Sequence, residues 1–399
     1  MQKKAVYRKL KLALALGVLF VTLAVALLGA LIRPDKTQDA NDQLISIAKL
    51  PPLADVKMLK VRKNKLFEHQ FWYELLLNGG RESEFMLVPI KGMEVQEHRV
   101  KVEVFNTSGI EEYRYYLFQD VLFALSDSAL IELGRNRTTD GVLTDLTGQQ
   151  IEFNREAMIA EIESEHVVRK SFLLGSDPYG RDMLSRLMAG SYVTLMVGVS
   201  SVLMALIIGV LIGICAGYFG GILDRVLLWL MNVFWSVPAI LLVISVTLVL
   251  GQGVMALVLG IGLILWVEMA QVIRGEVKSL SQKEYVKAAR LMGLSNFRIL
   301  YFHILPNLSG PILVLAVSNF AQAILLEAGL NFLGVGIRLP KPSWGGMVRE
   351  LYGFLITDGA YLAIVPSLAI VILVLSVVVL GASFQDRFKL KYGVTLRRG

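Results

Sequence analysis

The sequence predicts an all-α polytopic membrane protein with six transmembrane helices and an inserted small α+β extracytoplasmic subdomain. Hydrophobic residues make up 55% of the 399 residues and charged residues only 18%, against roughly 25% charged residues in ordinary soluble domains. The mean hydropathy is correspondingly high, at +0.58. A soluble protein of this length could not bury so much apolar surface, so the composition excludes a wholly soluble enzyme, a disordered chain and a fibrous repeat.

The basic charge of the chain is explained by the membrane. There are 40 Lys and Arg against 33 Asp and Glu, which gives a net charge of +7. In a soluble protein this excess would suggest nucleic acid as a partner, but basic residues also flank membrane spans on the cytoplasmic side. We therefore expect no nucleic-acid partner. The only cysteine, Cys215, lies in an apolar run, which excludes internal disulfides and cysteine-rich metal sites.

Six apolar runs are long enough to cross a bilayer, whose core of about 30 Å needs about 20 helical residues. The first, at 12–32, follows a basic start and has a secretory signal peptide as its alternative. It is longer than the signal core of about 7–15 residues, so we expect a retained helix. Five further runs follow at 192–217, 226–250, 254–273, 311–333 and 361–380.

Short loops that are rich in Lys and Arg stay on the cytoplasmic side of a membrane, so the distribution of these residues predicts the orientation of the spans. Both termini and the loop 274–306 are rich in them, whereas the opposite short loops carry only Arg338, Lys341 and Arg349. Both termini are therefore expected to be cytoplasmic. The predicted organisation is a cytoplasmic N-terminus at 1–11, a first helix at 12–32, an extracytoplasmic insertion at 33–171, a five-helix core at 172–386 and a basic tail at 387–399.

The insertion has the pattern of a small α+β subdomain. Valines alternate with other residues over 100–104, as in a strand. The residues 145–148 indicate a turn, and Asn154 can cap a helix that follows. The segment contains no zinc, nucleotide or nucleophile signature. Its three histidines are not at metal-ligand spacing: His69, His98 and His166.

The loop 274–306 is expected to be more than a connector. Its periodicity predicts a helix over 281–291, and two adjacent alanines, Ala288 and Ala289, would let another surface approach closely. Gly293 should end this helix, Ser295 should cap a second one, and Pro306 should end that one. The predicted docking side consists of Tyr285, Ala288, Ala289 and Met292. Docking into a partner's cleft is the favoured interpretation, and an amphipathic helix on lipid is the alternative.

Several ordered motifs carry a family resemblance. The loop reads EYVKAARLMG at 284–293 and ends in HILPN at 303–307. The segment at 174–186 reads LGSDPYGRDMLSR, and further matches lie at 217–221 and 326–345. Together they resemble the permease subunits of binding-protein-dependent ABC importers, in the oligopeptide/dipeptide/nickel branch. Two departures from the pattern of that family are Lys287, where a Glu is common, and Asn232, where an Asp is common.

The resemblance implies a complex in the bacterial inner membrane. This chain would pair with a second permease subunit as a heterodimer, with two ABC ATPases and with an extracytoplasmic substrate-binding protein. No G-x-x-x-x-G-K-[ST] motif occurs, so ATP and Mg would bind to the partner ATPases, and this chain would be non-catalytic and without a cofactor. The implied ATPase-coupling residues are Glu284, Tyr285, Ala288, Ala289, Gly293, His303, Leu305 and Pro306. The implied extracytoplasmic motif consists of Gly175, Asp177, Gly180, Arg181 and Asp182.

Polar residues inside the spans need a reason, because an ion at the bilayer centre costs about 2.5–3.5 kcal/mol. Asn319, Gln322 and Glu327 in the fifth span are candidates for the pathway or a gate, with interhelical hydrogen bonding as the alternative for the two amides. Glu268 is expected to reach the interface or to pair with a loop cation. Pro238 should kink the third span.

The expected function is therefore transport of peptides by alternating access. Nickel, glutathione or another small solute is the alternative cargo, since these motifs report coupling and not substrate. A membrane-anchored binding or sensor protein is a less favoured class. A secondary transporter is disfavoured because the spans show no inverted repeat with paired broken helices.

Overall fold

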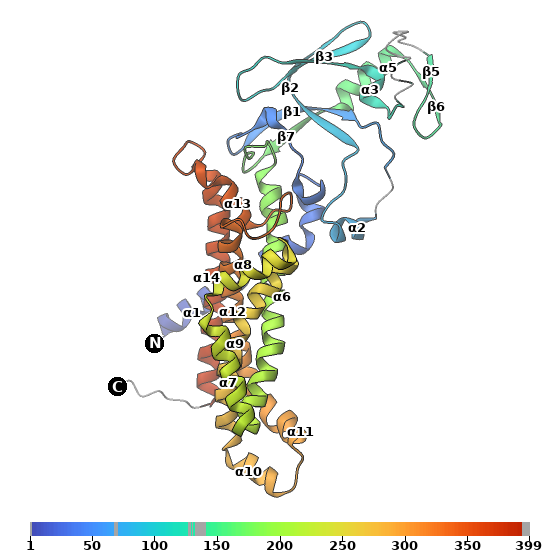
Figure 1. Cartoon of the computed structure of the whole chain (residues 1–399). Helices are drawn as coiled ribbons and strands as arrows, with labels where there is room; N and C mark the ends of the chain where they lie inside the picture. The colour runs from blue at the N-terminus through green and yellow to red at the C-terminus, as the bar shows by residue number, and fades with distance from the viewer. Residues whose placement is uncertain (1, 68–70, 127–128, 130, 132–140, 393–399) are drawn as a thin grey trace. The chain divides into compact units, whose positions relative to one another are not determined.

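The computed structural model describes residues 2–67, 71–126, 129, 131 and 141–392 (Figure 1). It divides into a helical unit, residues 1–26 and 190–399, and an insertion unit, residues 27–189. His69 and residues 393–399 of the predicted basic tail lie outside the described residues.

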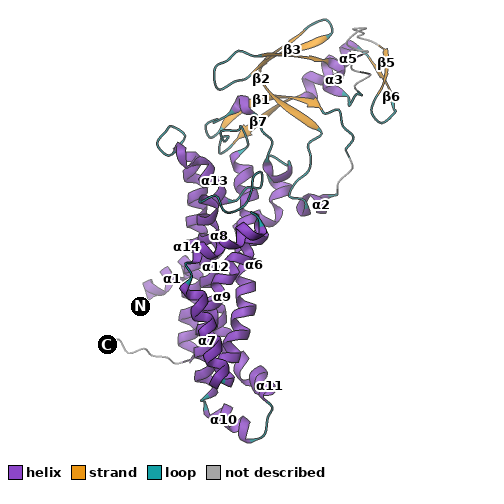
Figure 2. Ribbon diagram, viewed as in Figure 1, coloured by secondary structure: helices purple, strands orange, loops and turns teal. Residues whose placement is uncertain are grey.

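The helical unit consists mainly of long helices (Figure 2). Two of them cross the unit boundary: the end of α1 (Gln2–Ile32) and the start of α6 (Met183–Phe219) belong to the insertion unit. Among the described residues, five helical stretches are long and apolar enough to cross a membrane: Val6–Ile32, Met183–Phe219, Val254–Ser281, Asn296–Phe332 and Ala360–Asp386. The helices are α1 (Gln2–Ile32), α6 (Met183–Phe219), α7 (Gly221–Ser236), α8 (Ala239–Leu250), α9 (Val254–Ser281), α10 (Glu284–Leu291), α11 (Asn296–Ile299), α12 (Leu305–Phe332), α13 (Trp344–Leu351) and α14 (Ala360–Tyr392).

The predicted third span, 226–250, is not one kinked helix. It consists of α7 and α8, which meet at an angle of 86°. Val237, between them, has an extended backbone conformation, because a proline ring disfavours the helical conformation in the residue before it. The Ser236 hydroxyl donates to the Val233 carbonyl at 2.8 Å and satisfies one of the freed backbone groups. The described residues therefore contain five spanning helices, or six if this bent pair counts as one crossing.

The loop 274–306 also differs from its predicted boundaries. The helix predicted over 281–291 begins only at Glu284, because α9 continues to Ser281 and Lys283 is extended. Pro306 does not end a helix either. The π-helical turn Leu300–Ile304 joins α11 directly to α12, and Pro306 lies in the first turn of α12. A proline is tolerated there because the first turn of a helix leaves its N–H groups unbonded.

Close packing of α6 on α9 involves a row of glycines. Gly209, Gly213 and Gly217 are spaced four residues apart and so lie on one side of α6. A Cβ at Gly213 would lie 2.7 Å from the carbonyl oxygen of Ala270, and one at Gly217 would lie 2.6 Å from that of Arg274. Small residues at this spacing let two helix backbones approach. The helix that leads into α10 is therefore packed directly on the backbone of α6.

The insertion unit is built on a five-stranded antiparallel sheet with the strand order β4-β3-β2-β1-β7 (Figure 2). A two-stranded hairpin, β5 and β6, stands apart from it. The strands are β1 (Ala54–Arg62), β2 (Phe85–Val95), β3 (Arg99–Val104), β4 (Tyr113–Leu117), β5 (Gly141–Thr144), β6 (Gln150–Phe153) and β7 (Val167–Phe172). Figure 1 labels three short helices in this unit: α2 (Trp72–Leu77), α3 (Phe118–Leu122) and α5 (Arg155–Glu161).

The structure confirms three predictions made from short sequence patterns in the insertion unit. The alternation over 100–104 is strand β3, whose three valines are buried in a core shared with α3 and α5. The Asp145 carboxylate accepts from the backbone N–H of Thr147 at 2.8 Å and forms the predicted turn. Asn154 caps α5 by accepting from the N–H of Glu156 at 2.8 Å.

Candidate functional site

The helix α10, in the loop 274–306, is packed onto the helical unit along one side. Val286 and Ala289 are fully buried in a cluster with residues of α9, the π-helical turn and α12. Ala288 is exposed, although it is adjacent to Ala289 in sequence. The predicted docking side is therefore divided: Ala289 faces the body of the protein, and only Tyr285, Ala288 and Met292 face outward. The reason is the apolar pair Val286 and Ala289, which are spaced three residues apart and pack inward together.

The end of α10 has the geometry expected at Gly293. This residue has φ +76°, a conformation that glycine adopts without the steric cost of a side chain. The Gly293 N–H donates to the Arg290 carbonyl at 3.0 Å, and the Leu294 N–H donates to the Ala289 carbonyl at 3.2 Å. These two bonds make a Schellman motif. Ser295 then caps α11 by accepting from the N–H of Arg298, so both predicted boundaries are confirmed.

Polar contacts that the sequence did not suggest hold the loop to the helices. The Tyr218 hydroxyl, at the end of α6, donates to Asn296 Oδ1 at 2.9 Å. The Arg290 guanidinium lies 4.8 Å from the centre of the Tyr218 ring. Arg274 of α9 forms an ion pair with Asp224 of α7, with Nη2 at 2.7 Å from Oδ2. Tyr218 lies in the motif at 217–221, but nothing in the sequence paired it with a residue 78 positions away.

A group of exposed apolar side chains surrounds α10 and α11. Phe297 and Tyr301 stack with their ring centres 6.1 Å apart, and Tyr301 meets Phe302 edge-on at 4.9 Å. Leu291 and Met292 are 89% and 73% exposed. We call this set the coupling surface; its members are Tyr285, Leu291, Met292, Phe297, Tyr301 and Phe302.

The remaining predicted coupling residues lie at the edges of this region. Glu284 is exposed at the first turn of α10. His303 is half-buried, and its carbonyl accepts from Asn307 Nδ2 at 2.7 Å. Leu305 is half-buried and Pro306 is exposed. These positions support the turn from α11 into α12 and contribute less exposed surface than the aromatic residues.

A cavity of about 370 Å³ lies beside the break between α7 and α8. Gln322 of α12 and Glu268 of α9 both line it, and both side chains are exposed. Apolar neighbours of these two polar groups on the wall include Trp235, Pro238 and Leu242. The structure thus places Glu268 on a cavity wall, where the sequence suggested an interfacial position.

The other two predicted pathway residues do not face this cavity. Asn319 is fully buried, and its amide nitrogen and oxygen have no partner among the described residues. Glu327 is also fully buried, and its carboxylate accepts from Thr194 Oγ1 at 3.4 Å and from Asn331 Nδ2. The Asn331 oxygen accepts in turn from the Ile337 N–H at 2.6 Å. Glu327 therefore joins α6, α12 and the loop that follows α12, which is the contact pattern of a helix-packing residue.

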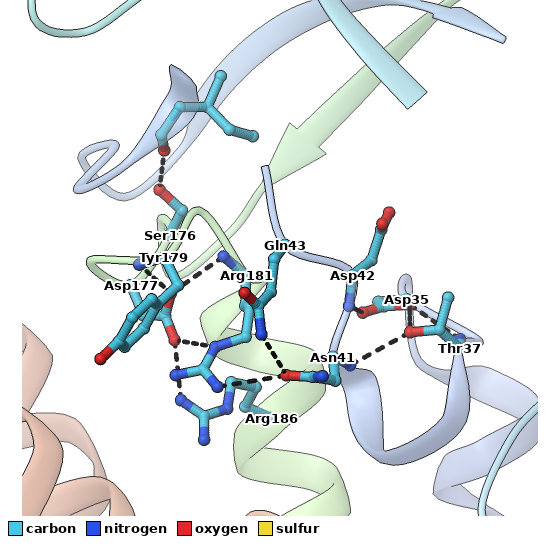
Figure 3. A network of polar contacts seen from close by, with 11 residues as sticks. Asp35, Thr37, Asn41, Asp42, Gln43, Ser176, Asp177, Tyr179, Arg181 and Arg186 are labelled. Carbon is cyan, nitrogen blue, oxygen red and sulfur yellow. Dashed lines mark hydrogen bonds and ion pairs between the residues drawn. The ribbon is translucent and has the colours of Figure 1, made fainter. Parts of the chain in front are cut away.

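The predicted extracytoplasmic motif forms a buried network of polar contacts in the insertion unit, which we call the latch (Figure 3). The Asp177 carboxylate accepts from Arg181 Nε at 2.6 Å, from Arg186 Nη1 at 2.8 Å and from the Tyr179 N–H at 2.8 Å. Asp177, Arg181 and Arg186 are each at most 3% exposed at the side chain. Paired charges of this kind are strongly coupled, because removing one leaves the others buried without compensation.

The same motif connects the chain after α1 to the first turn of α6. Asp182 accepts from the Ser185 N–H at 2.8 Å, and the Ser185 hydroxyl accepts from the Asp35 N–H at 2.8 Å. Burial raises the pKa of Asp182. Gly180 has φ +73°, and a Cβ there would lie 1.8 Å from the Leu44 carbonyl oxygen. The insertion unit runs from Leu27 to Ala189 and thus includes the end of α1 and the start of α6, beyond the predicted 33–171.

Comparison with known proteins gives the family. Residues 209–392 match the binding-protein-dependent transport system inner membrane components. The glutathione transport system permease protein GsiD of Pectobacterium atrosepticum is 36% identical over 213 residues, which are 53% of this chain and 70% of that protein. The chain belongs to this family. The predicted resemblance to ABC importer permeases is confirmed.

Other relatives of this permease chain agree. The di/tripeptide transport system permease protein DppC of Pseudomonas aeruginosa is 34% identical over 215 residues, 54% of this chain and 71% of that protein. The solved methionine transporter MetNI is similar over 52% of this chain and 95% of that one, with 21% identity and a TM-score of 0.41, which is too weak a likeness to support an argument. The family match includes α10, α11 and α12, whereas the insertion unit, residues 27–189, lies outside it.

Proposed function

We propose that this permease carries peptides inward, powered by partner ATPases and supplied by an extracytoplasmic binding protein. The observation that carries the proposal is the attachment of α10 to the helical unit beneath an exposed apolar coupling surface. Relatives named for glutathione and for di- and tripeptides support this class of cargo. The chain would bind no cofactor itself; ATP and Mg would bind to the ATPase subunits.

The attachment suggests how motion would pass from the ATPases to the spans. Val286 and Ala289 anchor α10, the Schellman motif at Gly293 sets the turn, and the Tyr218–Asn296 hydrogen bond ties α11 to α6. A movement of the coupling surface would therefore displace α6, α9 and α12 together. This is rigid-body switching of a packed element by a nucleotide-driven partner.

The cavity beside α8 is the proposed part of the pathway in this chain. A carboxylate within an apolar span costs about 2.5–3.5 kcal/mol, so its presence calls for a function. Glu268 would face the ammonium group of a passing peptide, and Gln322 would exchange hydrogen bonds with its amides. A second permease subunit, in a heterodimer, would supply the opposite wall.

The proposed topology has six crossings, with α7 and α8 forming one and both termini in the cytoplasm. It is tested in a Cys215→Ala background with one cysteine in the insertion, Ser108→Cys, or one in the loop, Lys287→Cys; both positions are exposed. An impermeant maleimide should label position 108 in intact cells, or in spheroplasts if there is an outer membrane, and position 287 only after lysis. Labelling of both positions from the same side would exclude this topology.

The transport role is tested in proteoliposomes that contain the assembled complex. Met292→Glu places a charge in the coupling surface and should lower binding-protein-stimulated ATP hydrolysis and peptide uptake by about tenfold or more. The matched control is Gln282→Glu, which adds the same charge at an exposed position of the same loop outside that surface. Normal uptake by Met292→Glu would mean that this loop does not transmit the motion.

A further inference from the structure

The insertion unit carries an exposed aromatic segment that its own core does not explain. Phe71, Trp72 and Tyr73 lie at the start of α2 and are 58%, 66% and 47% exposed. The rings of Phe71 and Tyr73 stack at 5.6 Å between centres, and Trp72 meets Tyr73 edge-on at 6.1 Å. The buried core of the sheet contains none of the three. Three large aromatic rings side by side on the surface indicate a contact with something outside the chain.

The position of α2 is set by the end of the first span. Arg33 directly follows α1, and its Nη2 donates to the Gly79 carbonyl, two residues after α2, at 2.6 Å. The Asp39 N–H donates to the same carbonyl at 3.2 Å. Gly80 is packed so closely that a Cβ would lie 2.5 Å from Arg33 Nη2. Figure 1 shows α2 apart from the sheet. The helix is therefore tethered where α1, apolar as far as Ile32, leaves the bilayer.

The dimensions suit the bilayer interface. The six residues of α2 span about 9 Å at 1.5 Å per residue. The headgroup region is roughly 5–8 Å thick on each side of the hydrocarbon core. Aromatic side chains, Trp and Tyr above all, concentrate in this region because they combine an apolar ring with a polar group. The exposed side chains of Lys36 and Arg81 lie beside the tether, where they could meet lipid phosphates.

We propose that Phe71, Trp72 and Tyr73 insert into the outer-leaflet interface and hold the insertion unit against the bilayer. The partner is the phospholipid surface itself, which is continuous with the surface that α1 crosses. This inference goes beyond the transport role and rests on the proposed topology, in which α1 spans the membrane and the insertion unit is extracytoplasmic. Anchoring at this point would restrict the motion of the insertion unit relative to the membrane.

The test uses the assembled complex in nanodiscs, with a fraction of the phospholipids spin-labelled at the headgroup. In the Cys215→Ala background, an environment-sensitive fluorophore is attached at Asn78→Cys, an exposed position at the end of α2 that leaves the aromatic residues intact. The matched control is Ser108→Cys, exposed in the loop between β3 and β4. We expect at least twofold stronger quenching by the spin-labelled lipid at position 78 than at position 108. Replacing the three aromatic residues with serine should abolish the difference.

Two results would overturn the proposal. Equal, weak lipid quenching at both positions, with free access of aqueous iodide, would mean that α2 faces water. Shielding of position 78 from both lipid and iodide would mean that a protein subunit covers the aromatic segment. Neither result depends on transport activity, so the outcome is independent of whether the cargo is a peptide.

Discussion

The packing of α10 can be tested by exploiting its two adjacent alanines. Ala289 is fully buried among apolar residues of α9 and α12, whereas Ala288 is exposed. Ala289→Leu adds three carbons to a filled site, and overpacking of this kind costs typically about 1–3 kcal/mol. Ala288→Leu adds the same atoms to the surface, where changes usually stay within about 0.5 kcal/mol. At about 1.4 kcal/mol per factor of ten, Ala289→Leu should raise the undocked population of α10 by about 5- to 150-fold.

Limited proteolysis measures this population directly. Lys283, Lys287 and Arg290 are exposed trypsin sites in and beside α10, and cleavage within the helix requires it to open. Ala289→Leu should be cleaved at least fivefold faster than the unmodified protein, and Ala288→Leu at an unchanged rate. In the assembled transporter, Ala289→Leu should also reduce stimulated ATP hydrolysis. Equal cleavage of the two variants would show that α10 is not held by this side, and the proposed route of motion from α10 to α9 would be wrong.

Three further predictions concern the insertion unit of the full chain. Asp177→Asn should cost about 3–5 kcal/mol, because Arg181 stays buried without its countercharge; an unchanged midpoint of thermal unfolding would contradict this. Gly180→Ala should also lower that midpoint, since its Cβ would overlap the Leu44 carbonyl; equal stability would mean that this turn can relax. Burial raises the pKa of Asp42, so its ionised form is disfavoured in the folded state and stability should fall as the pH rises through the raised value. Asp42→Asn should remove the part of this dependence that comes from Asp42, leaving that of Asp182, and should unfold at a higher temperature at pH 7, as measured by unfolding scans at several pH values.

The sequence alone predicted the features that depend only on residues close to one another along the chain. Apolar runs identified the spanning helices, because a helix in lipid needs a continuous apolar surface. Gly293 marked a left-handed helix end, and Asn154 and Ser295 marked helix starts, because each acts on backbone groups within one turn. The ordered motifs likewise indicated the permease family, which the family match confirms.

Tertiary structure decided which side chains meet, and no local signal contains that information. The alanines at 288 and 289 are chemically identical, and only the apolar surface of α9 and α12 determines that Ala289 is the buried one. Glu327 is hydrogen-bonded to Thr194, 133 positions away in the sequence, and to Asn331, and no local pattern pairs it with Thr194. The latch joins Asp35 to Ser185 across 150 positions of sequence. Such contacts form only when the whole chain has folded, because burial and pairing are properties of the packed surface and not of the residue.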